Sequence, residues 1–441
     1  MATLRDYLKP VSETTSRRLG VGVFCCVSVL LLCWAGFRFG LDIPPSGTGD
    51  EPSYDSMSWE IIKGNGFTID YTDLEFRSPY EKAVDSMGSL YRLPNTRYGV
   101  AAFRPPLLST INAGLNLIFG RQFFALRSLN ILFMAGTAGL LISWISRKYN
   151  LLVAGLLLAI LLLDVRFRLY ARAILTEACA CFLCTLLTLT LLKLRERDTY
   201  RHIIAAGVLV GLSILTRTIV ILWLPGLSLF VFMLLRRFHS TSLSHGFKRT
   251  LTFAGCTLLV ISPWAIRNIQ LLGTFAPMGT QGMMELSAGY SDIAWENHGV
   301  WQNLNTHGFF DGDDFGNKAG FERELAVAEV SKARAMEWTR HNVAKLPALA
   351  AMKVANEFWP REIVEGVVLL LMLIGIVRTR KSPTTVVLLG LLLTNVFAIA
   401  VTWSVLGRFL VPQMFVMYAL AAASFSTQSQ QPENESTECS T

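Results

Sequence analysis

The sequence carries little charge for its length. Of 441 residues only 16% are charged and 52% are hydrophobic, whereas a soluble domain has about 25% charged residues. A chain with so little polar surface cannot enclose its apolar residues within soluble domains. The composition therefore excludes a cytosolic enzyme, a disordered scaffold and a secreted disulfide module, and it indicates a protein that crosses a membrane several times.

Cysteine is absent where a disulfide framework would need it. The first polar segment (residues 41–122) and the second polar segment (residues 270–361) contain none, and seven of the eight cysteines lie in apolar blocks. No disulfides therefore hold these segments. Cys179, Cys181 and Cys184 have Leu and Phe neighbours and no nearby histidine. We expect them to pack as small apolar side chains rather than to bind a metal.

Nucleotide and metal motifs are also missing. The sequence has no P-loop and no Gly-x-Gly-x-x-Gly turn. The acidic stretch Asp311–Asp314, near His298 and His307, lacks the full ligand spacing of a calcium or zinc site, so we interpret it as a solvated loop. The net charge of +8 does not require nucleic acid, because basic loops between apolar blocks specify membrane orientation. We expect no cofactor, no metal and no nucleic-acid partner.

What the sequence does contain is a series of apolar blocks. They predict an all-α polytopic membrane protein with about ten transmembrane helices, within a range of about 9–12. The candidate spans are residues 20–40, 123–145, 150–163, 173–192, 203–216, 219–235, 250–269, 363–377, 384–402 and 408–425. Basic residues precede the first block and no small-residue cleavage site follows it, so we expect a retained signal anchor.

The loop charges predict the orientation. With ten spans both termini lie on one side, and the basic clusters after residues 145, 192, 235 and 377 all fall on that cytoplasmic side. Counting residues 105–119 as a further span would invert every later loop, so we expect a helix packed at the outer surface instead. The membrane domain is then 1–425, and 426–441 is a disordered cytoplasmic tail.

Several arginines lie at the outer boundary of the predicted spans, where positive charge is disfavoured, and four of them form a candidate set. An ionisable residue at membrane depth costs at least about 2.5 kcal/mol, so a functional role is its default interpretation. The structural alternative is snorkelling, or an ion pair such as Arg172–Glu177. Because a guanidinium group donates two parallel hydrogen bonds and stays protonated, the set suggests a shared anion site for a phosphate. Its members are Arg172, Arg217, Arg267 and Arg408.

An acidic pair, Asp50-Glu51, directly precedes a short amphipathic pattern in the first polar segment. Tyr54, Met57 and Ile61 would share one helix face. One interpretation makes Asp50 an N-cap residue, with Pro52 in the first turn. The other places two carboxylates just outside the membrane opposite the arginines, where one of them takes a proton from a hydroxyl group.

Together these residues resemble the polyprenol-phosphate-sugar-dependent glycosyltransferases of the GT-C fold. The nearest groups are the protein O-mannosyltransferases and the bacterial lipid A aminoarabinose transferases. The Asp-Glu pair after the first span is followed in order by similar motifs. They are Gly64-Asn-Gly-Phe67, Arg104-Pro-Pro-Leu107, Tyr170-Ala-Arg-Ala-Ile-Leu-Thr-Glu177, Pro263-Trp-Ala-Ile-Arg-Asn268 and Arg408-Phe-Leu-Val-Pro412.

The resemblance implies a GT-C bundle with extracytoplasmic juxtamembrane helices and transfer of a sugar from a polyprenyl phosphate to an acceptor hydroxyl, with inversion. Asp50 would be the base, Glu51 would orient the acceptor or tune Asp50, and the four arginines would bind the donor phosphate. Glu177 would hold Arg172. Tyr54, Arg104 and Asn268 would support the site, and no metal would be required.

Departures from these families bear on the acceptor. Tyr54 and Arg104 stand where protein O-mannosyltransferases usually have histidine, and the large lumenal insertion of the eukaryotic enzymes is absent. These differences favour a bacterial relative in the inner membrane, with a lipid, glycan or protein acceptor. The alternatives are a transporter or a lipid-linked sugar flippase, which would place charges near the membrane midplane, and a non-catalytic membrane scaffold.

Overall fold

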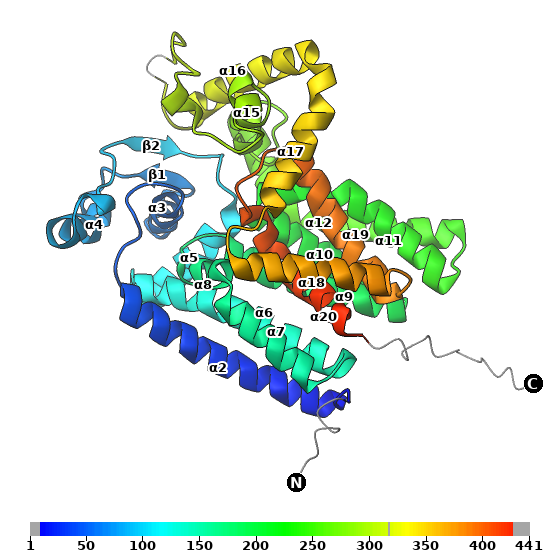
Figure 1. The fold of residues 1–441 in the computed structure, drawn as a ribbon. Coiled ribbons are helices and arrows are strands. Elements are labelled where there is room, and N and C mark those ends of the chain that lie inside the picture. The colour runs from blue at the N-terminus through cyan, green and yellow to red at the C-terminus, as the bar shows by residue number, and fades with distance from the viewer. Residues whose placement is uncertain (1–8, 316–317, 427–441) are drawn as a thin grey trace, which may run out of the picture.

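Helices account for nearly all of the regular structure in the computed structural model, which describes residues 9–315 and 318–426 (Figure 1). Each of the ten predicted spans coincides with a helical stretch. These stretches are α2 (Glu13–Phe39), α6 (Phe123–Lys148), α7 (Leu151–Leu163), α9 (Glu177–Glu196), α10 (Tyr200–Thr216), η2 and α11 (Thr218–Leu222, Trp223–His239), α12 (Leu243–Leu272), α18 (Ile363–Thr379), α19 (Pro383–Ala400), and η5, α20 and η6 (Arg408–Gln413, Met414–Ala422, Ala423–Phe425).

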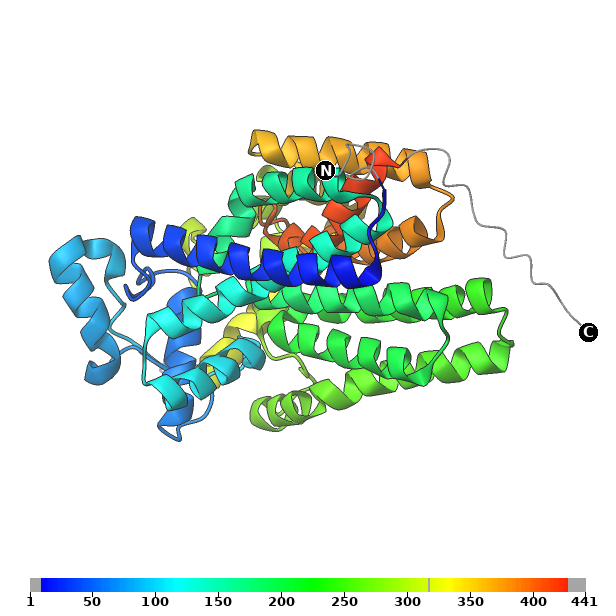
Figure 2. The same cartoon turned by 90° about the horizontal axis from the view of Figure 1, so that it is seen from below.

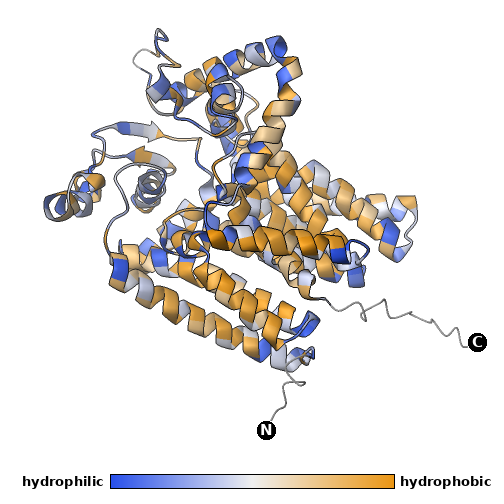
Figure 3. Ribbon diagram, in the orientation of Figure 1, coloured by the Kyte–Doolittle hydropathy of each residue, from blue (hydrophilic) through white to orange (hydrophobic). Residues whose placement is uncertain are grey.

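Seven of these stretches are long and apolar enough to cross a membrane, which agrees with a multi-pass membrane protein. The last one, Arg408–Phe425, is 89% buried and forms the centre of the bundle, whereas Glu13–Phe39 is 33% buried and lies at its edge. Figure 3, coloured by residue hydropathy, shows the hydrophobic residues concentrated in this bundle and more of the hydrophilic ones in the segments at one end of it. Residue 408, where the polar end meets the central stretch, is an arginine.

Glycine allows the central helices to approach closely. A Cβ atom at Gly375 of α18 would lie 1.9 Å from the carbonyl oxygen of Leu420 in α20, and one at Gly207 of α10 would lie 2.5 Å from that of Phe253 in α12. Backbones this close leave no room for a side chain between them. Small residues at helix crossings are how membrane helices gain packing contacts without a hydrophobic driving force.

The first polar segment forms a small unit beside the end of α2. It contains α3 (Glu51–Ile62), β1 (Thr68–Asp70), α4 (Leu74–Met87), η1 (Ser89–Tyr91), β2 (Arg97–Val100) and α5 (Pro106–Phe119). The two strands pair antiparallel, with Thr68 opposite Val100. Helix α5, over the stretch predicted to be a non-spanning helix (105–119), has 14 residues and packs against α3.

The second polar segment covers the same end of the bundle. It contains α13 (Gln281–Met284), α14 (Leu286–Gly289), α15 (Asp292–Glu296), η3 (Leu304–His307), α16 (Gly320–His341), η4 (Val343–Lys345) and α17 (Leu346–Phe358). Glu324 of α16 joins the two polar segments, because one of its oxygens accepts hydrogen bonds from the Ala102 N–H (2.9 Å) and the Thr280 hydroxyl (3.0 Å).

The start of α2 and the end of η6 lie on the side opposite the polar segments (Figure 2), as an even number of spans requires. At that side the Val11 N–H donates to the Ser146 carbonyl (3.2 Å), and Arg378 donates to the Ser424 carbonyl (2.9 Å). The predicted tail, residues 426–441, lies outside the described residues apart from Ser426.

One buried charge in the second polar segment has a cost that can be measured. Lys353 of α17 is 0% exposed, and among residues 9–315 and 318–426 its Nζ has no hydrogen-bond partner. The Nζ lies 3.8 Å from the centre of the Tyr290 ring, and burial lowers the pKa of Lys353 to about 7. In the unfolded chain a lysine stays protonated up to about pH 10.4. Between these two values the unfolded state binds more protons, so stability should rise with pH across that window and the cost should be greatest near pH 7 or below.

We therefore expect Lys353→Met, which keeps the shape of the side chain, to raise the thermal unfolding midpoint by about 2–5 °C at pH 7. The gain should shrink at pH 10, because neutralising a lysine costs little free energy so close to its pKa in the unfolded chain. Differential scanning fluorimetry of both proteins at the two pH values measures this difference. An equal gain at both values would contradict the assignment of the cost to the buried charge.

Candidate active site

The acidic pair lies where the first polar segment meets the bundle. Asp50 occupies the N-cap position of α3, with Pro52 in the first turn, as one interpretation expected, but its side chain makes no capping hydrogen bond to the helix. One oxygen of Asp50 instead accepts from Arg104 (2.6 Å) and the other from Arg408 (3.0 Å). Asp50 therefore binds two guanidinium groups from distant parts of the chain.

These contacts continue into a chain of charges that we call the ion-pair chain: Arg104, Asp50, Arg408, Glu177 and Arg217. Arg408 also donates to Glu177, and the same Glu177 oxygen accepts from Arg217 at 2.5 Å. Glu177 is fully buried, whereas Asp50 and Arg408 are 28% and 27% exposed. Three guanidinium groups against two carboxylates leave the chain with one excess positive charge.

The prediction that Glu177 holds Arg172 is wrong. Although Arg172 and Glu177 are close in sequence, α8 (Val165–Arg172) ends before α9 begins, and the intervening turn directs the two side chains differently. Arg172 lies with its guanidinium carbon 3.6 Å from the centre of the Phe39 ring, while Glu177 faces Arg217 and Arg408. The buried carboxylate of Glu177 therefore binds Arg217 and Arg408, and it does not bind Arg172.

The two carboxylates have opposite electrostatic environments. Burial by itself would raise the pKa of Asp50, but the guanidinium groups of Arg104 and Arg408 outweigh it and hold that pKa well below its usual value. Burial raises the pKa of Glu51, and the N–H of Ile174 with nearby guanidinium groups opposes this only in part. Asp50 is therefore firmly ionised, while Glu51 binds a proton more readily than an ordinary glutamate.

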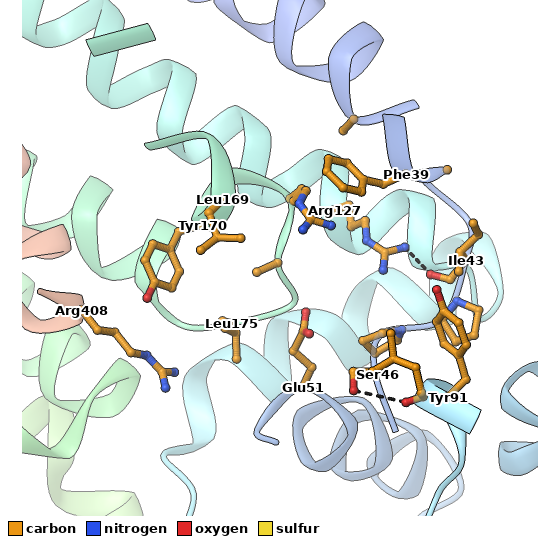
Figure 4. A pocket seen from close by; sticks show the side chains of 17 residues that line it. Phe39, Ile43, Ser46, Glu51, Tyr91, Arg127, Leu169, Tyr170, Leu175 and Arg408 are labelled. Carbon is orange, nitrogen blue, oxygen red and sulfur yellow. Dashed lines mark hydrogen bonds between the residues drawn. The ribbon is translucent and has the colours of Figure 1, made fainter. Parts of the chain in front are cut away.

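Glu51 faces a cavity of about 520 Å³ between the end of α2, α8 and the first polar segment. One Glu51 oxygen accepts the Ile174 N–H at 2.7 Å. Figure 4 shows Glu51, Arg127 and Arg408 reaching this Glu51 cavity from three different elements. Its lining combines apolar and charged side chains; it includes Ala35, Phe39, Ile43, Leu169, Tyr170, Leu175, Glu51, Arg127, Arg172 and Arg408.

The structure separates the four predicted phosphate-binding arginines. Arg172 and Arg408 line the Glu51 cavity, and Arg217 lies behind it on Glu177. Arg267 is outside the cavity lining: its guanidinium carbon lies 4.6 Å from the centre of the Trp264 ring, and it donates to Asn268 at 2.8 Å. Asn268 in turn donates to the Pro277 carbonyl at 3.2 Å. The four arginines therefore do not converge on one point.

Tyr54 and Arg104, the other predicted supporting residues, pack together beneath the acidic pair. Tyr54 is buried, and the guanidinium carbon of Arg104 lies 5.5 Å from the centre of its ring. Arg104 also donates to the Ser53 hydroxyl at 3.1 Å. An arginine that bonds to both Asp50 and Ser53 fixes the start of α3, which explains a supporting role for this position.

Arg127 of α6 is a cavity residue that we did not predict from the sequence. It donates to the carbonyl oxygens of Leu41 (2.6 Å) and Ile43, and so holds the turn that leaves α2. The sequence could have predicted it, because Arg127 is an arginine near the outer end of a predicted span, the same feature that identified Arg217 and Arg408.

The described residues contain no cluster of three or more His, Cys, Asp or Glu side chains arranged to hold a metal ion. Cys179, Cys181 and Cys184 are buried in α9. In the acidic stretch of the second polar segment, Asp313 pairs with Arg334 at 2.9 Å. The charged groups at the Glu51 cavity are thus carboxylates and guanidinium groups, a set suited to anion binding and proton transfer.

Comparison with known proteins bears on the fold and on the class of enzyme. The family described as dolichyl-phosphate-mannose-protein mannosyltransferase matches residues 103–266. No curated protein sequence matches the chain at a significant level. The oligosaccharyltransferase of Archaeoglobus fulgidus in the apo form superimposes with a TM-score of 0.51 at 14% identity, covering 91% of this chain and 50% of that protein.

ArnT from Cupriavidus metallidurans bound to undecaprenyl phosphate aligns with a TM-score of 0.42 at 15% identity, covering 92% of this chain and 77% of that protein. The likeness to the oligosaccharyltransferase shows a GT-C fold, and the family match supports glycosyltransferase activity on that fold. The predicted fold class and the predicted class of enzyme are therefore confirmed.

Proposed function

We propose that this membrane glycosyltransferase transfers a sugar from a polyprenyl phosphate to an acceptor hydroxyl group, and that the reaction takes place at the Glu51 cavity. The observation that carries the proposal is the lining of this cavity, which combines apolar side chains of α2 and α8 with three arginines, Arg127, Arg172 and Arg408. A polyprenyl phosphate sugar has the same combination, a hydrocarbon tail next to an anion.

The phosphate would lie between Arg127, Arg172 and Arg408. Among the described residues no carboxylate lies within ion-pair distance of Arg127 or Arg172, so their positive charge is not neutralised by direct contact. Guanidinium groups bind phosphate oxygens with charge-assisted hydrogen bonds. The apolar side chains of α2 and α8 would receive the first part of the lipid tail. Arg217 then acts through Glu177, and Arg267 has no place in this phosphate site.

The transfer would be a single displacement. The acceptor oxygen attacks the anomeric carbon, the bond from that carbon to the phosphate oxygen breaks, and the acceptor proton passes to Asp50, so the anomeric centre inverts. Phosphate leaves as an anion and needs no general acid. The arginines stabilise the negative charge that develops on it, which is usually the largest single contribution to catalysis.

The exposure of the two carboxylates supports this division of roles. Asp50 is 28% exposed and lies on the ion-pair chain, where an acceptor approaching from the polar segments can reach it. Glu51 faces the cavity that would hold the donor. Glu51 would therefore accept hydrogen bonds from hydroxyl groups of the donor sugar, while Arg104 and Tyr54 hold Asp50 in place.

The charge pattern supports a location for this reaction. The basic loops lie on the side away from the polar segments, so the positive-inside rule supports cytoplasmic termini and a site on the extracytoplasmic face. We propose the inner membrane of a bacterium, with a lipid, glycan or protein as acceptor.

The test is to incubate the purified protein in nanodiscs with radiolabelled polyprenyl-phosphate sugars and candidate acceptors. Release of free polyprenyl phosphate together with labelled acceptor supports the proposal. Movement of the intact lipid-linked sugar across a bilayer without release of polyprenyl phosphate would instead support a flippase. A protein that produces neither result with any donor would contradict the proposed function.

Arg172→Ala is expected to raise the donor KM by about 10–100-fold, because a charge-assisted hydrogen bond to phosphate contributes about 1.5–3 kcal/mol. Arg267→Ala is the matched control, since Arg267 is also an arginine at the outer end of a predicted span but lies outside the cavity lining. Steady-state kinetics with varied donor measures both. Equal effects of the two substitutions would contradict a phosphate site at the Glu51 cavity.

A further inference from the structure

A buried carboxylate of the second polar segment binds the loop that carries Arg408. Glu357, near the end of α17, is 0% exposed. One of its oxygens accepts from the Ser404 hydroxyl and the Val405 N–H, both at 2.8 Å, and the other accepts from the Phe409 N–H at 2.6 Å. Glu357 thus makes three hydrogen bonds to residues on both sides of Arg408.

The loop needs such an anchor because its backbone conformation is unfavourable. Leu406 and Gly407 have φ values of 57° and 87°, and a left-handed conformation is uncommon for a residue such as leucine. A second contact comes from the same polar segment, where the Trp301 N–H donates to the Ser404 carbonyl at 2.8 Å. Strained conformations persist only where surrounding contacts impose them.

The position of this loop decides where Arg408 points. The guanidinium group of Arg408 bridges Asp50 and Glu177 and lines the Glu51 cavity. A shift of the loop would therefore move the group that contacts the proposed base and, by the proposed function, the leaving phosphate. A displacement of about 1 Å from a productive geometry can lower a rate by about 100-fold.

We infer that Glu357 is a positioning residue, which couples the second polar segment to the active site by fixing the loop that aims Arg408. The inference rests on the proposed function, since Arg408 has a catalytic role only if the Glu51 cavity binds the donor. Glu357 itself touches neither the cavity nor the acidic pair.

Glu357→Gln tests this with almost no change in shape. A glutamine has one oxygen and one NH₂ group, so only one end of it can accept hydrogen bonds. Its NH₂ group must then face either the Phe409 N–H or the Ser404 hydroxyl and Val405 N–H, which donate to Glu357 in the wild type. Glu324→Gln is the matched control, because Glu324 is also a buried carboxylate between polar segments but uses a single oxygen for both of its hydrogen bonds. A glutamine oxygen can accept both of them.

We expect Glu357→Gln to lower kcat for sugar transfer by about tenfold or more, with a smaller change in donor KM, since an interaction made in the transition state is weakened. Glu324→Gln should stay within about twofold of the wild type. In an Arg408→Lys background the effect of Glu357→Gln should nearly disappear, because residues that act through one another are not additive. Full additivity would overturn the positioning role.

Hydrogen exchange of the backbone gives a second measurement that does not depend on activity. The amides of Val405 and Phe409 should exchange faster in Glu357→Gln than in the wild type or in Glu324→Gln. Unchanged exchange would overturn the inference, and so would faster exchange with an unaltered kcat. If the wild type transferred no sugar from any donor, the proposed function would fail, while the exchange result would still show whether Glu357 fixes the loop.

Discussion

Replacing Asp50 with asparagine is expected to lower the rate of sugar transfer by about 10²–10⁴-fold, the usual contribution of a general base. Asparagine has nearly the same shape, but it cannot accept the acceptor proton. Its amide NH₂ would also face Arg104 or Arg408, each of which now donates to an Asp50 oxygen. The measurement is kcat with saturating donor, for a variant that elutes as a folded protein in detergent.

Glu51→Gln is the comparison that separates the two carboxylates. If Glu51 orients the donor sugar, this change should mainly raise the donor KM and leave much of kcat. A variant Asp50→Asn with normal turnover, together with an inactive Glu51→Gln, would reassign the base to Glu51, whose pKa is raised by burial.

The pH dependence should follow from the ion pairs of Asp50. Because Arg104 and Arg408 hold the pKa of Asp50 well below its usual value, protonation of the base requires a lower pH than for an isolated aspartate, which titrates near pH 4. Protonation of Asp50 should therefore lower the rate only below about pH 4. Arg104→Ala should move the acidic limb upward.

Arg408→Ala should have the second large effect, a loss of about 10²–10³-fold in kcat, because its guanidinium group contacts Asp50 and the buried Glu177 and, by the proposed function, the leaving phosphate. Removing it would also leave Glu177, which is fully buried, with Arg217 as its remaining ion-pair partner. We therefore expect a lower thermal midpoint in addition to the kinetic defect.

Arg408→Lys distinguishes charge from geometry. Lysine keeps the positive charge but lacks the planar fork that lets one side chain donate to two carboxylates. If the bridging geometry matters, the lysine variant should recover part of the thermal midpoint and little of kcat. Wild-type kinetics in Arg408→Ala would refute both the phosphate role of Arg408 and the inference about Glu357.

Much of the fold could be predicted because its signals are local. A run of apolar residues such as 408–425 indicates a helix in a bilayer whatever surrounds it, since the backbone must satisfy its own hydrogen bonds there. The basic clusters at the ends of the spans then predict which ends lie on the same side of the membrane. The two described chain ends do lie on one side of the bundle. The exclusion of 105–119 as a span used the same charge rule, and α5 is a 14-residue helix.

The candidate site could be predicted only in part. Asp50, Glu51 and Arg408 were identifiable because ionisable groups next to apolar runs are costly and need an explanation. Arg172 was assigned to Glu177 from its spacing on a supposed continuous helix, but a turn between α8 and α9 separates the two side chains. Arg267 could not be separated from the cavity by sequence, because its partners Trp264 and Asn268 are its neighbours on α12.

The sequence by itself determined the membrane bundle, its helical segments and the presence of an acidic pair and several arginines at one end, because these features depend on nearby residues and on the solvent around them. Only the tertiary structure decided which charges meet. Asp50 and Arg408 are 358 residues apart, and Glu357 reaches the Arg408 loop from another polar segment. Such contacts depend on how the helices pack, and a change of one turn would exchange every partner, so no local pattern specifies them.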